Sequence, residues 1–337
     1  MIQDVIQQLL AGNDLERDTA RAVMDQIMSG DATDAQIGGF LIALRCKGET
    51  VDEIAGFAQV MRGKATPIEG GKSTLVDTCG TGGDGSGTFN ISTTVAFVAA
   101  GAGLTVAKHG NRAMSSQCGS ADVLQALGVN VEASSEQVTR CLDQAGIGFL
   151  FAPMLHGAMK HAIGPRKELA TRTVFNVLGP LTNPAGARRQ LLGVYDASLT
   201  QKLAGVLGAL GSERAFVVHG SDGLDEITST GPSTVTELNE GKLDTYEVQP
   251  SDFGFDVAAA ADLKGGSAVE NAKILSSVLD GEPGAAREIV VMNAAAAVAA
   301  GGLAGDLKQG AVVAAKAIDS GKAKAALETL VSVSNQG

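Results

Sequence analysis

The sequence contains no tryptophan, and only 4% of its 337 residues are aromatic. Its core must therefore be built mainly from aliphatic side chains. Positive charge is also scarce, because 26 Lys and Arg residues face 37 Asp and Glu residues and leave a net charge of −11. This balance argues against a general nucleic-acid surface, which needs clustered positive charge. A local basic pocket for a small anion stays compatible with it.

The cysteines also exclude several classes of protein. Cys46, Cys79, Cys118 and Cys141 include no Cys-x-x-Cys pair, which argues against a zinc site and a disulfide framework. No apolar run reaches the roughly 20 residues of a membrane helix. The first four residues, 1–4, carry no basic segment typical of a secretion signal. We therefore expect a cytoplasmic protein that binds neither membrane nor nucleic acid.

Two regions of different character follow each other along the chain. Residues 1–63 show only helical periodicity, and Thr33 with Gln36 and Thr50 with Glu53 match the capping box that begins a helix. From Leu75 onward, short apolar runs alternate with helical segments, which favours a mostly parallel sheet flanked by helices. The apolar runs occupy residues 104–107, 129–131, 147–151, 191–195 and 215–218. Residues 234–238 and 242–248 are typical of a hairpin.

The predicted fold class is thus α/β, with a small all-helical N-terminal domain and a larger α/β domain. We place the helical domain at residues 1–70 and the α/β domain at residues 71–337. Residues 153–184 have little strand character and several prolines. We expect about residues 160–185 to return to the helical domain and to act as a hinge.

The most informative stretch is a glycine-rich segment, Gly80-Thr81-Gly82-Gly83-Asp84-Gly85-Ser86-Gly87, between an apolar run and a helical pattern. Glycines permit positive φ and let backbone N–H groups close on an anion, and a helix N-terminus adds further donors. The order strand, glycine loop, helix therefore predicts a phosphate site. Asp84 is unusual for a pure anion site and indicates that a cation or a sugar hydroxyl binds there too.

Two further segments follow other apolar runs. Lys108 and Arg112 supply positive charge beside several hydroxyl residues, and we expect both to face the glycine loop, because strand ends meet at the carboxyl edge of a parallel sheet. Asp225 and Glu226 follow the run at 215–218 and suit magnesium, which is held by one or two carboxylates plus phosphate oxygens. An Asp-Glu pair taken alone is more often solvated surface.

Two residues allow more than one interpretation from the residues alone. Arg166 can form a bidentate pair with a substrate carboxylate, although a lone arginine is more often a surface residue. His109 has the chemistry of a general base, but a hydrogen-bonded loop histidine explains it equally well.

Taken together, these motifs resemble the anthranilate phosphoribosyltransferase family. The resemblance rests on the glycine segment, Asn90-Ile91-Ser92-Thr93, Lys108-His109-Gly110-Asn111-Arg112, Ser115-Ser116 and Asn176-Val177-Leu178-Gly179-Pro180-Leu181-Thr182-Asn183-Pro184, and it extends over essentially the whole chain. It implies transfer of a phosphoribosyl group from 5-phosphoribosyl 1-diphosphate to anthranilate, with Mg²⁺, in tryptophan biosynthesis. It also implies a homodimer formed through the helical domain.

The resemblance assigns residues to three groups. The residues implied to bind the phosphoribosyl diphosphate are Gly80, Gly83, Asp84, Thr88, Asn90, Ile91, Ser92, Thr93, Lys108, Ser116 and Ser120. Those implied to bind anthranilate or to line its entry are Gly80, Asn111, Arg166, Pro153, His156 and Met159. The implied magnesium ligands are Ser92, Asp225 and Glu226. An aryl amine is uncharged near neutral pH, so no strong base is required, and we give His109 a supporting role.

Two other functions remain open at this point. Pyrimidine nucleoside phosphorylases share the expected architecture and a Lys-His loop, but typically carry Ser-x-x-x-Lys where this chain has Asn176-Val177-Leu178-Gly179-Pro180. A non-catalytic nucleic-acid-binding relative would be expected to have a basic cleft and damaged loops. The net charge of −11 and the intact loops argue against it.

Overall fold

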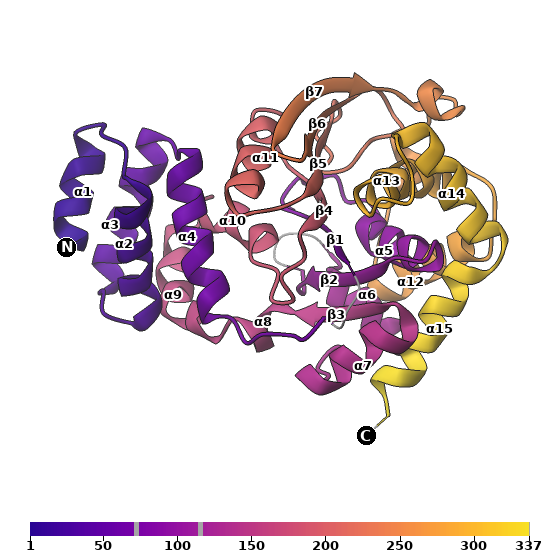
Figure 1. Cartoon of the computed structure of the whole chain (residues 1–337), viewed down its shortest axis with the longest axis horizontal. Helices are drawn as coiled ribbons and strands as arrows, with labels where there is room; N and C mark the ends of the chain where they lie inside the picture. The colour runs from indigo at the N-terminus through magenta and orange to yellow at the C-terminus, as the bar shows by residue number, and fades with distance from the viewer. Residues whose placement is uncertain (71–73, 114–116, 337) are drawn as a thin grey trace.

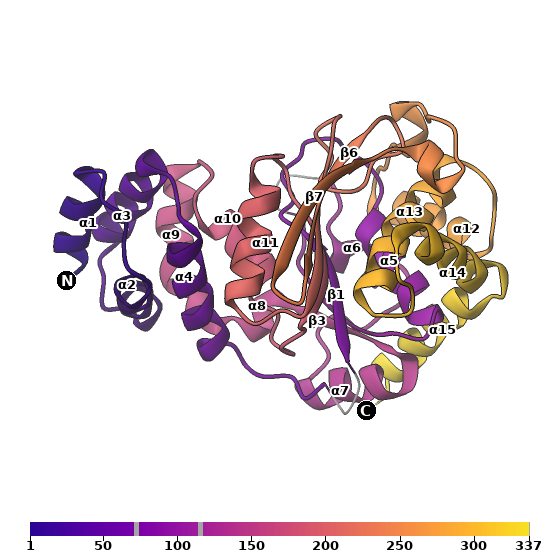
Figure 2. The same cartoon turned by 45° about the horizontal axis from the view of Figure 1, so that its top comes forward.

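The first 64 residues fold into helices, as their periodicity predicts. The computed structural model describes every residue except 71–73, 114–116 and 337. Its first helices are α1 (Ile2–Leu10), α2 (Arg17–Ser29), α3 (Asp34–Lys47) and α4 (Val51–Lys64). Both predicted capping boxes are present: Thr33 caps α3 with Gln36, and Thr50 caps α4 with Glu53. These helices lie together at one end of the molecule (Figures 1 and 2).

Seven strands among the described residues form one sheet, in the order β3-β2-β1-β4-β5-β6-β7. The strands are β1 (Leu75–Gly80), β2 (Thr105–Gly110), β3 (Ile147–Phe151), β4 (Arg189–Gly193), β5 (Arg214–Gly220), β6 (Ser233–Asn239) and β7 (Lys242–Val248). The first five are parallel, and β6 and β7 form the predicted antiparallel hairpin at one edge. The mostly parallel sheet expected from the alternation is therefore confirmed.

The strand order reverses at β1. From β1 the chain proceeds to β2 and β3 on one side, and then returns to add β4 on the other side. Such a switch point opens a crevice at the carboxyl ends of the strands, where ligands of open α/β sheets bind. The last pair of the β1–β4 register joins Gly80 to Gly193. The predicted glycine loop therefore begins directly at the switch point.

One apolar run forms no strand. Residues 129–131, all of them described, follow α6 (Ser120–Ala126) without regular secondary structure, with Val129 and Val131 buried in the core. The N–H of Asn130 donates to Oγ of Ser334, 3.1 Å away in the last helix. This backbone group is therefore satisfied by a side chain and not by a neighbouring strand. The run is apolar because its valines pack into the core, not because it forms a strand.

Helices cover both faces of the sheet. The other α-helices among the described residues are α5 (Ile91–Gly101), α6 (Ser120–Ala126), α7 (Ser135–Ala145), α8 (Ala152–Leu155), α9 (Lys160–Leu169), α10 (Phe175–Leu178), α11 (Leu199–Ala209), α12 (Ala268–Leu279), α13 (Ala285–Ala300), α14 (Leu307–Asp319) and α15 (Lys322–Ser334). On one face, α5 and α13 pack on β1 and β4, and α12, α14 and α15 lie around them. On the other face, α11 packs on β5 and β6.

The helical end is continuous with the second face. Successive residues of β4 point to opposite sides, so Leu191 belongs to the core under α13 while Leu192 belongs to a core shared with α1–α4. Helix α11 also contacts α4. The N-terminal helices are thus attached to the sheet through apolar packing.

Residues 152–184 run from the sheet to the N-terminal helices. Helix α9 packs against α2 and α3, and α10 contacts α4 (Figure 1). The chain then returns to the sheet at β4. The domain boundary at residues 70 and 71 and the hinge role of this segment stay predictions.

Candidate active site

The glycine loop links β1 to α5 and lies against the acidic loop that follows β5. Gly82, Gly83, Gly85 and Gly87 all have φ between +64° and +76°, a region that L side chains rarely adopt. The N–H of Gly82 donates to Oδ2 of Asp225 over 2.8 Å. A Cβ on Gly80 would lie 2.3 Å from the same oxygen. The strand end therefore needs glycine so that Asp225 can approach it.

Lys108 comes from the neighbouring strand β2 and is almost fully buried, with 2% of its surface exposed. Its Nζ donates to the carbonyl oxygen of Thr78 over 2.5 Å and lies 3.5 Å from Oγ of Ser92. Burial lowers the pKa of Lys108, and the carboxylates of Asp77 and Glu226 oppose that shift. The ammonium group is therefore held beside the start of α5, as the sequence predicts for an anion site.

The acidic pair lies next to this ammonium group, with Glu226 buried and Asp225 partly buried. Burial, with Asp84 as a nearby negative charge, raises the pKa of Asp225 to about 6. Burial and the adjacent Asp225 raise the pKa of Glu226 well above its usual range, against the opposing effects of Lys108 and the Ser92 N–H. Two carboxylates that repel each other in a buried position favour a bound cation. This is not the solvated surface pair that the sequence alone left open.

Asp222, in the same loop, has a different role. Its Oδ2 accepts hydrogen bonds from the hydroxyls of Thr228, at 2.7 Å, and Thr230, at 2.6 Å. These bonds close the loop on itself. Asp222 therefore shapes the segment that presents Asp225 and Glu226.

Residues at the start of α5 connect three parts of the site. The Asn90 side chain donates to the Cys118 carbonyl at 3.1 Å and accepts from Asn271 of α12 at 2.9 Å. Thr93 is 1% exposed, and within the described part of the chain its hydroxyl has no hydrogen-bond partner. Ile91 is a buried core residue. Thr88 forms a β-bridge with Lys264.

The loop after β2 is only partly as expected. Ser120 begins α6, and its hydroxyl accepts from the Asn111 N–H at 3.2 Å and donates to the Asn111 carbonyl at 3.1 Å. The expectation that Arg112 faces the glycine loop is wrong. Its guanidinium donates to Asp122 at 3.1 Å and to Gln125 at 3.0 Å, because α6 offers it partners close by. Ser115 and Ser116 lie outside the described residues.

Four of the residues assigned to anthranilate, Pro153, His156, Met159 and Arg166, lie on the segment that crosses to the helical end. Pro153 belongs to α8, and Met159 lies just before α9, which carries Arg166. The guanidinium of Arg166 lies over the ring of Phe175, 5.1 Å from its centroid. Its orientation is therefore set by an aromatic partner of α10.

The side chain of His156 contacts that of His109, which lies on β2. Their Nε2 atoms are 3.2 Å apart. Burial, together with the neighbouring imidazole, lowers the pKa of His109 to about 3, and burial lowers the pKa of His156 to about 4. Both rings are thus neutral near pH 7, and the backbone carbonyl of Gly179 is a further partner of His109. This pair supports a positioning role for His109 rather than base catalysis.

Two residues of the site were not singled out from the sequence. Asp77 is fully buried on β1; it accepts from the His109 N–H at 3.1 Å and from the Asn183 side chain at 2.8 Å. Arg172 donates to the carbonyl of Gly83. Asp77 is the one charged residue of β1, whose residues 75–79 are all buried, and this is a readable signal of a buried polar role. Arg172 has no such signal, since only the fold brings it to the glycine loop.

Comparison with known proteins agrees with this geometry. Residues 3–65 match a model of the helical bundle domain of a glycosyl transferase family, and residues 72–324 match the α/β domain of the same family. An anthranilate phosphoribosyltransferase of Moorella thermoacetica is 57% identical over 331 residues, which is 98% of both chains. The chain belongs to the anthranilate phosphoribosyltransferase family. Its members are phosphoribosyltransferases, so the first of the functions considered from the sequence is the one supported.

Solved structures of the family share the fold. The anthranilate phosphoribosyltransferase of Thermus thermophilus has a TM-score of 0.94 and 42% identity, covering 99% of this chain and all of that one. The enzyme of Saccharomyces cerevisiae in complex with PRPP and Mg has a TM-score of 0.89 and 29% identity, covering 99% and 97% of the two chains. Over the described residues, no helix has the length and apolar character needed to span a membrane.

Proposed function

We propose that this chain transfers the 5-phosphoribosyl group of 5-phosphoribosyl 1-diphosphate to the amine of anthranilate and releases diphosphate. The observation that carries the proposal is the convergence of Lys108, the glycine loop and the Asp225-Glu226 pair at the switch point of the sheet. Displacing diphosphate builds negative charge on the leaving group. Lys108 and the N–H groups of a glycine loop stabilise such charge without reorganising, which is electrostatic catalysis.

The magnesium site is proposed at Ser92, Asp225 and Glu226. These residues offer only oxygen ligands, as magnesium prefers. Within the described residues there is no group of three or more His, Cys, Asp and Glu side chains able to hold a metal by themselves. Two carboxylates that need substrate oxygens to complete the coordination fit this finding. Bound magnesium would neutralise charge on the diphosphate.

The remaining diphosphate contacts are proposed from the resemblance to the family. The residues proposed to contact the phosphoribosyl diphosphate besides Lys108 and Ser92 are Gly80, Gly83, Asp84, Thr88, Asn90, Ile91, Thr93, Ser116 and Ser120. The buried, unpartnered hydroxyl of Thr93 supports this assignment, because such a group needs a hydrogen-bond partner.

Anthranilate is proposed to bind between the loop after β2 and the α8–α9 segment. Arg166 would pair with its carboxylate, and Asn111, Pro153, His156 and Met159 would line the approach. The neutral His109–His156 pair offers no strong base, which suits an amine that attacks in its uncharged form. The contribution of these residues is then orientation of the two reacting groups.

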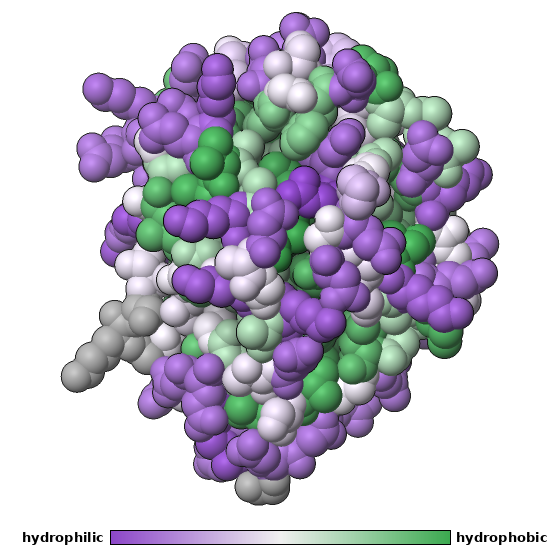
Figure 3. Space-filling view, turned by 90° about the vertical axis from the view of Figure 1, so that its right-hand side faces the viewer, coloured by the Kyte–Doolittle hydropathy of each residue, from purple (hydrophilic) through white to green (hydrophobic). Residues whose placement is uncertain are grey.

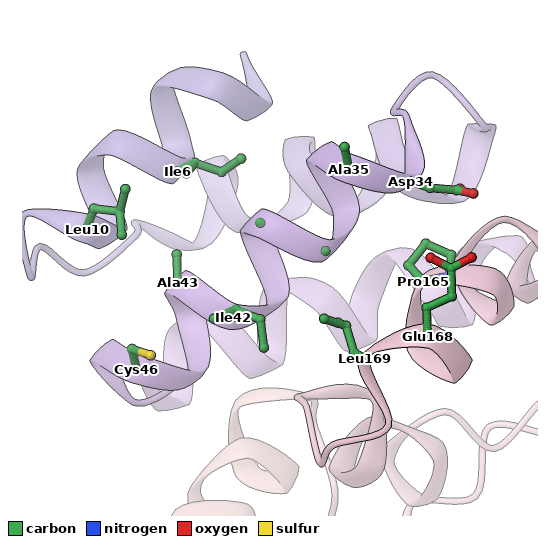
Figure 4. Close-up of a pocket in the computed structure, with 12 residues that line it drawn as sticks. Ile6, Leu10, Asp34, Ala35, Ile42, Ala43, Cys46, Pro165, Glu168 and Leu169 are labelled. Atoms are coloured by element: carbon green, nitrogen blue, oxygen red, sulfur yellow. The ribbon is translucent and has the colours of Figure 1, made fainter.

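A homodimer is proposed through the helical end. The faces of α1, α3 and α9 form a groove of about 790 Å³ (Figure 4). The apolar residues lining it include Ile6, Leu10, Ile42, Ala43 and Leu169. Figure 3 shows the opposite end of the molecule, where hydrophilic and apolar residues are mixed. We place a second copy of the chain on this face, since a two-fold dimer brings the same apolar patch of both copies together.

The sedimentation or light-scattering mass of the purified chain tests the dimer. We expect twice the mass of the single chain, 34.1 kDa, and a monomer for Ile42→Glu. A wild-type monomer at assay concentrations would contradict this interface. The cytoplasmic setting stays a prediction.

The activity itself is tested by mixing the protein with anthranilate, 5-phosphoribosyl 1-diphosphate and magnesium. Anthranilate fluorescence should fall only when all three are present. Persistent fluorescence with folded protein would overturn the proposed function. Phosphate-dependent cleavage of thymidine would instead revive the phosphorylase hypothesis.

A further inference from the structure

The connection between α9 and α10 presents Arg172 to the glycine loop. Helix α9 ends at Leu169, and Ala170 follows with φ of 46°, a left-handed conformation that alanine rarely adopts. The chain then turns toward the sheet, and the N–H of Thr173 donates to Oδ1 of Asn176 over 2.9 Å. A disfavoured backbone conformation persists only where its surroundings hold it. The turn therefore places Arg172 in a fixed direction.

The Arg172 guanidinium contacts both the loop and the strand end beside it. Its Nη2 donates to the Gly83 carbonyl. Its Cζ lies 4.0 Å from the ring centroid of Tyr195, within the range of a cation–π contact. The Tyr195 N–H donates to Oγ1 of Thr81 over 3.1 Å, so Tyr195 is itself tied to the loop. The Arg172 side chain thus holds the glycine loop while its guanidinium stacks on the Tyr195 ring.

The backbone of Arg172 also joins this contact to the N-terminal helices. Nη1 of Arg45, in the last turn of α3, donates to the Arg172 carbonyl. Arg45, Arg172 and Gly83 therefore form a continuous path from α3 to the glycine loop. A displacement of α3 relative to the sheet would therefore change the position of Gly83.

The bond at Gly83 has a consequence for the next amide. In a trans peptide the C=O and the following N–H point in opposite directions. Holding the Gly83 carbonyl toward Arg172 therefore directs the Asp84 N–H away from it. The Gly82 N–H is held on another side by Asp225. Glycine-rich segments lose much conformational entropy on ordering, and a loop fixed in advance loses less of it when it binds an anion.

We propose that Arg172 is a positioning residue that holds the glycine loop ready for 5-phosphoribosyl 1-diphosphate and couples the loop to the N-terminal helices through Arg45. This rests on the proposed function. Arg172 is not assigned a contact with substrate, and it acts through the peptide between Gly83 and Asp84.

The test compares Arg172→Ala with wild type in three measurements. We expect the KM for 5-phosphoribosyl 1-diphosphate to rise about tenfold, as for loss of one charged hydrogen bond, while kcat and the KM for anthranilate change less than twofold. Hydrogen exchange of the amides in residues 81–88 should become faster. Arg172→Lys should restore part of the affinity, because it keeps a donor but lacks the planar face.

Arg188→Ala is the matched control. Arg188 is exposed, as Arg172 is, and its Nε donates to the carbonyl of another glycine, Gly211, over 2.9 Å. Arg188 directly precedes β4, so this contact lies at the amino ends of the strands, away from the glycine loop. Arg188→Ala should leave both KM values and the hydrogen exchange of residues 81–88 unchanged. Arg45→Ala should raise the KM for the diphosphate substrate less than Arg172→Ala does. Combined with Arg172→Ala it should add nothing.

Unchanged KM values in Arg172→Ala would overturn the proposal, as would a lowered melting temperature with no faster exchange of the loop. If Arg172→Ala does not fold, Arg172→Lys and Tyr195→Ala carry the same comparison. A wild-type chain without any turnover would overturn the proposed function instead. The exchange of residues 81–88 would still decide whether Arg172 holds the loop.

Discussion

The two ends of the sheet use charged residues differently. At the amino ends of β4 and β5, Arg189 and Arg214 contact carboxylates and helix carbonyls. At the carboxyl ends of β1, β2 and β5, Lys108 lies near the carboxylates of Asp225 and Glu226. Arg214 forms an ion pair with Glu237 at 2.8 Å and donates to the Ala299 carbonyl at 2.8 Å. Arg189 donates to Glu213 at 3.1 Å and to the Gly301 carbonyl at 2.8 Å. These arginines satisfy the C-terminal end of α13, whose carbonyls have no helical partners.

Among the described residues, the carboxyl ends show no comparable pairing. Lys108 donates to neutral oxygens of Thr78 and Ser92, while Asp225 and Glu226 lie together with raised pKa values. Burying a charge without full compensation lowers stability. The comparison teaches that one end of the sheet uses charge to hold the fold. The other end keeps charge available for a ligand, and the predictions below test this division.

The largest effect is expected for Lys108→Met, which removes the ammonium group and roughly keeps the volume. The rate of anthranilate consumption should fall by about 100- to 1,000-fold, or about 3–4 kcal/mol, as for loss of one group that stabilises a developing anion. The free energy of unfolding should fall by less than about 1 kcal/mol, since burial already disfavours the charged lysine. Initial rates and urea titrations measure the two quantities.

Arg214→Met should show the reverse pattern at the amino end. We expect a loss of about 2 kcal/mol in the free energy of unfolding, because the change leaves Glu237 and the Ala299 carbonyl without their charged donor. Both KM values should stay within twofold of wild type. A variant that loses activity without losing stability would remove the distinction between the two ends.

Arg166→Ala should weaken anthranilate binding by about tenfold, or about 1.4 kcal/mol, because the proposed pair with the substrate carboxylate is lost. Steady-state kinetics at saturating 5-phosphoribosyl 1-diphosphate give the KM for anthranilate. Lys167→Ala changes the next, exposed side chain and serves as the control. An unchanged KM in Arg166→Ala would show that the assignment is wrong.

The last effect concerns pH. Burial depresses the pKa of His156 to about 4 from 6.5, so the unfolded chain binds more protons than the folded chain between these values. Stability from this group is complete above about pH 6.5 and is lost as the pH falls toward 4, with a slope of at most about 1.4 kcal/mol per pH unit. His156→Gln should flatten the decline in urea titrations from pH 7 to 4. An identical slope in both proteins would contradict the neutral histidine pair.

Local chemistry made much of the fold predictable from the sequence. The capping boxes at Thr33 and Thr50, the hairpin and the glycine loop each depend on residues close together in the chain, so their signals can be read directly. Lys108 lies beside Thr78 and Ser92, on either side of the glycine loop, because neighbouring parallel strands end at the same edge.

Long-range contacts were not predictable in the same way. Arg112 turned to Asp122 because α6 places a carboxylate nearer than the glycine loop, and only the folded chain reveals that choice. His109 and His156 meet across 47 positions of sequence. Arg172 reaches Gly83 only because the chain turns at Ala170 after crossing to the helical end. Spacing alone carries no information on these directions.

The division between the two ends is tested most directly by melting wild type, Lys108→Met and Arg214→Met with and without 5-phosphoribosyl 1-diphosphate and magnesium. A ligand that binds the folded state raises its melting temperature. We predict the same rise for Arg214→Met as for wild type, from a lower starting temperature. Lys108→Met should start within a few degrees of wild type and rise little. An equal rise in all three proteins, or a Lys108→Met protein less stable than Arg214→Met, would contradict the account.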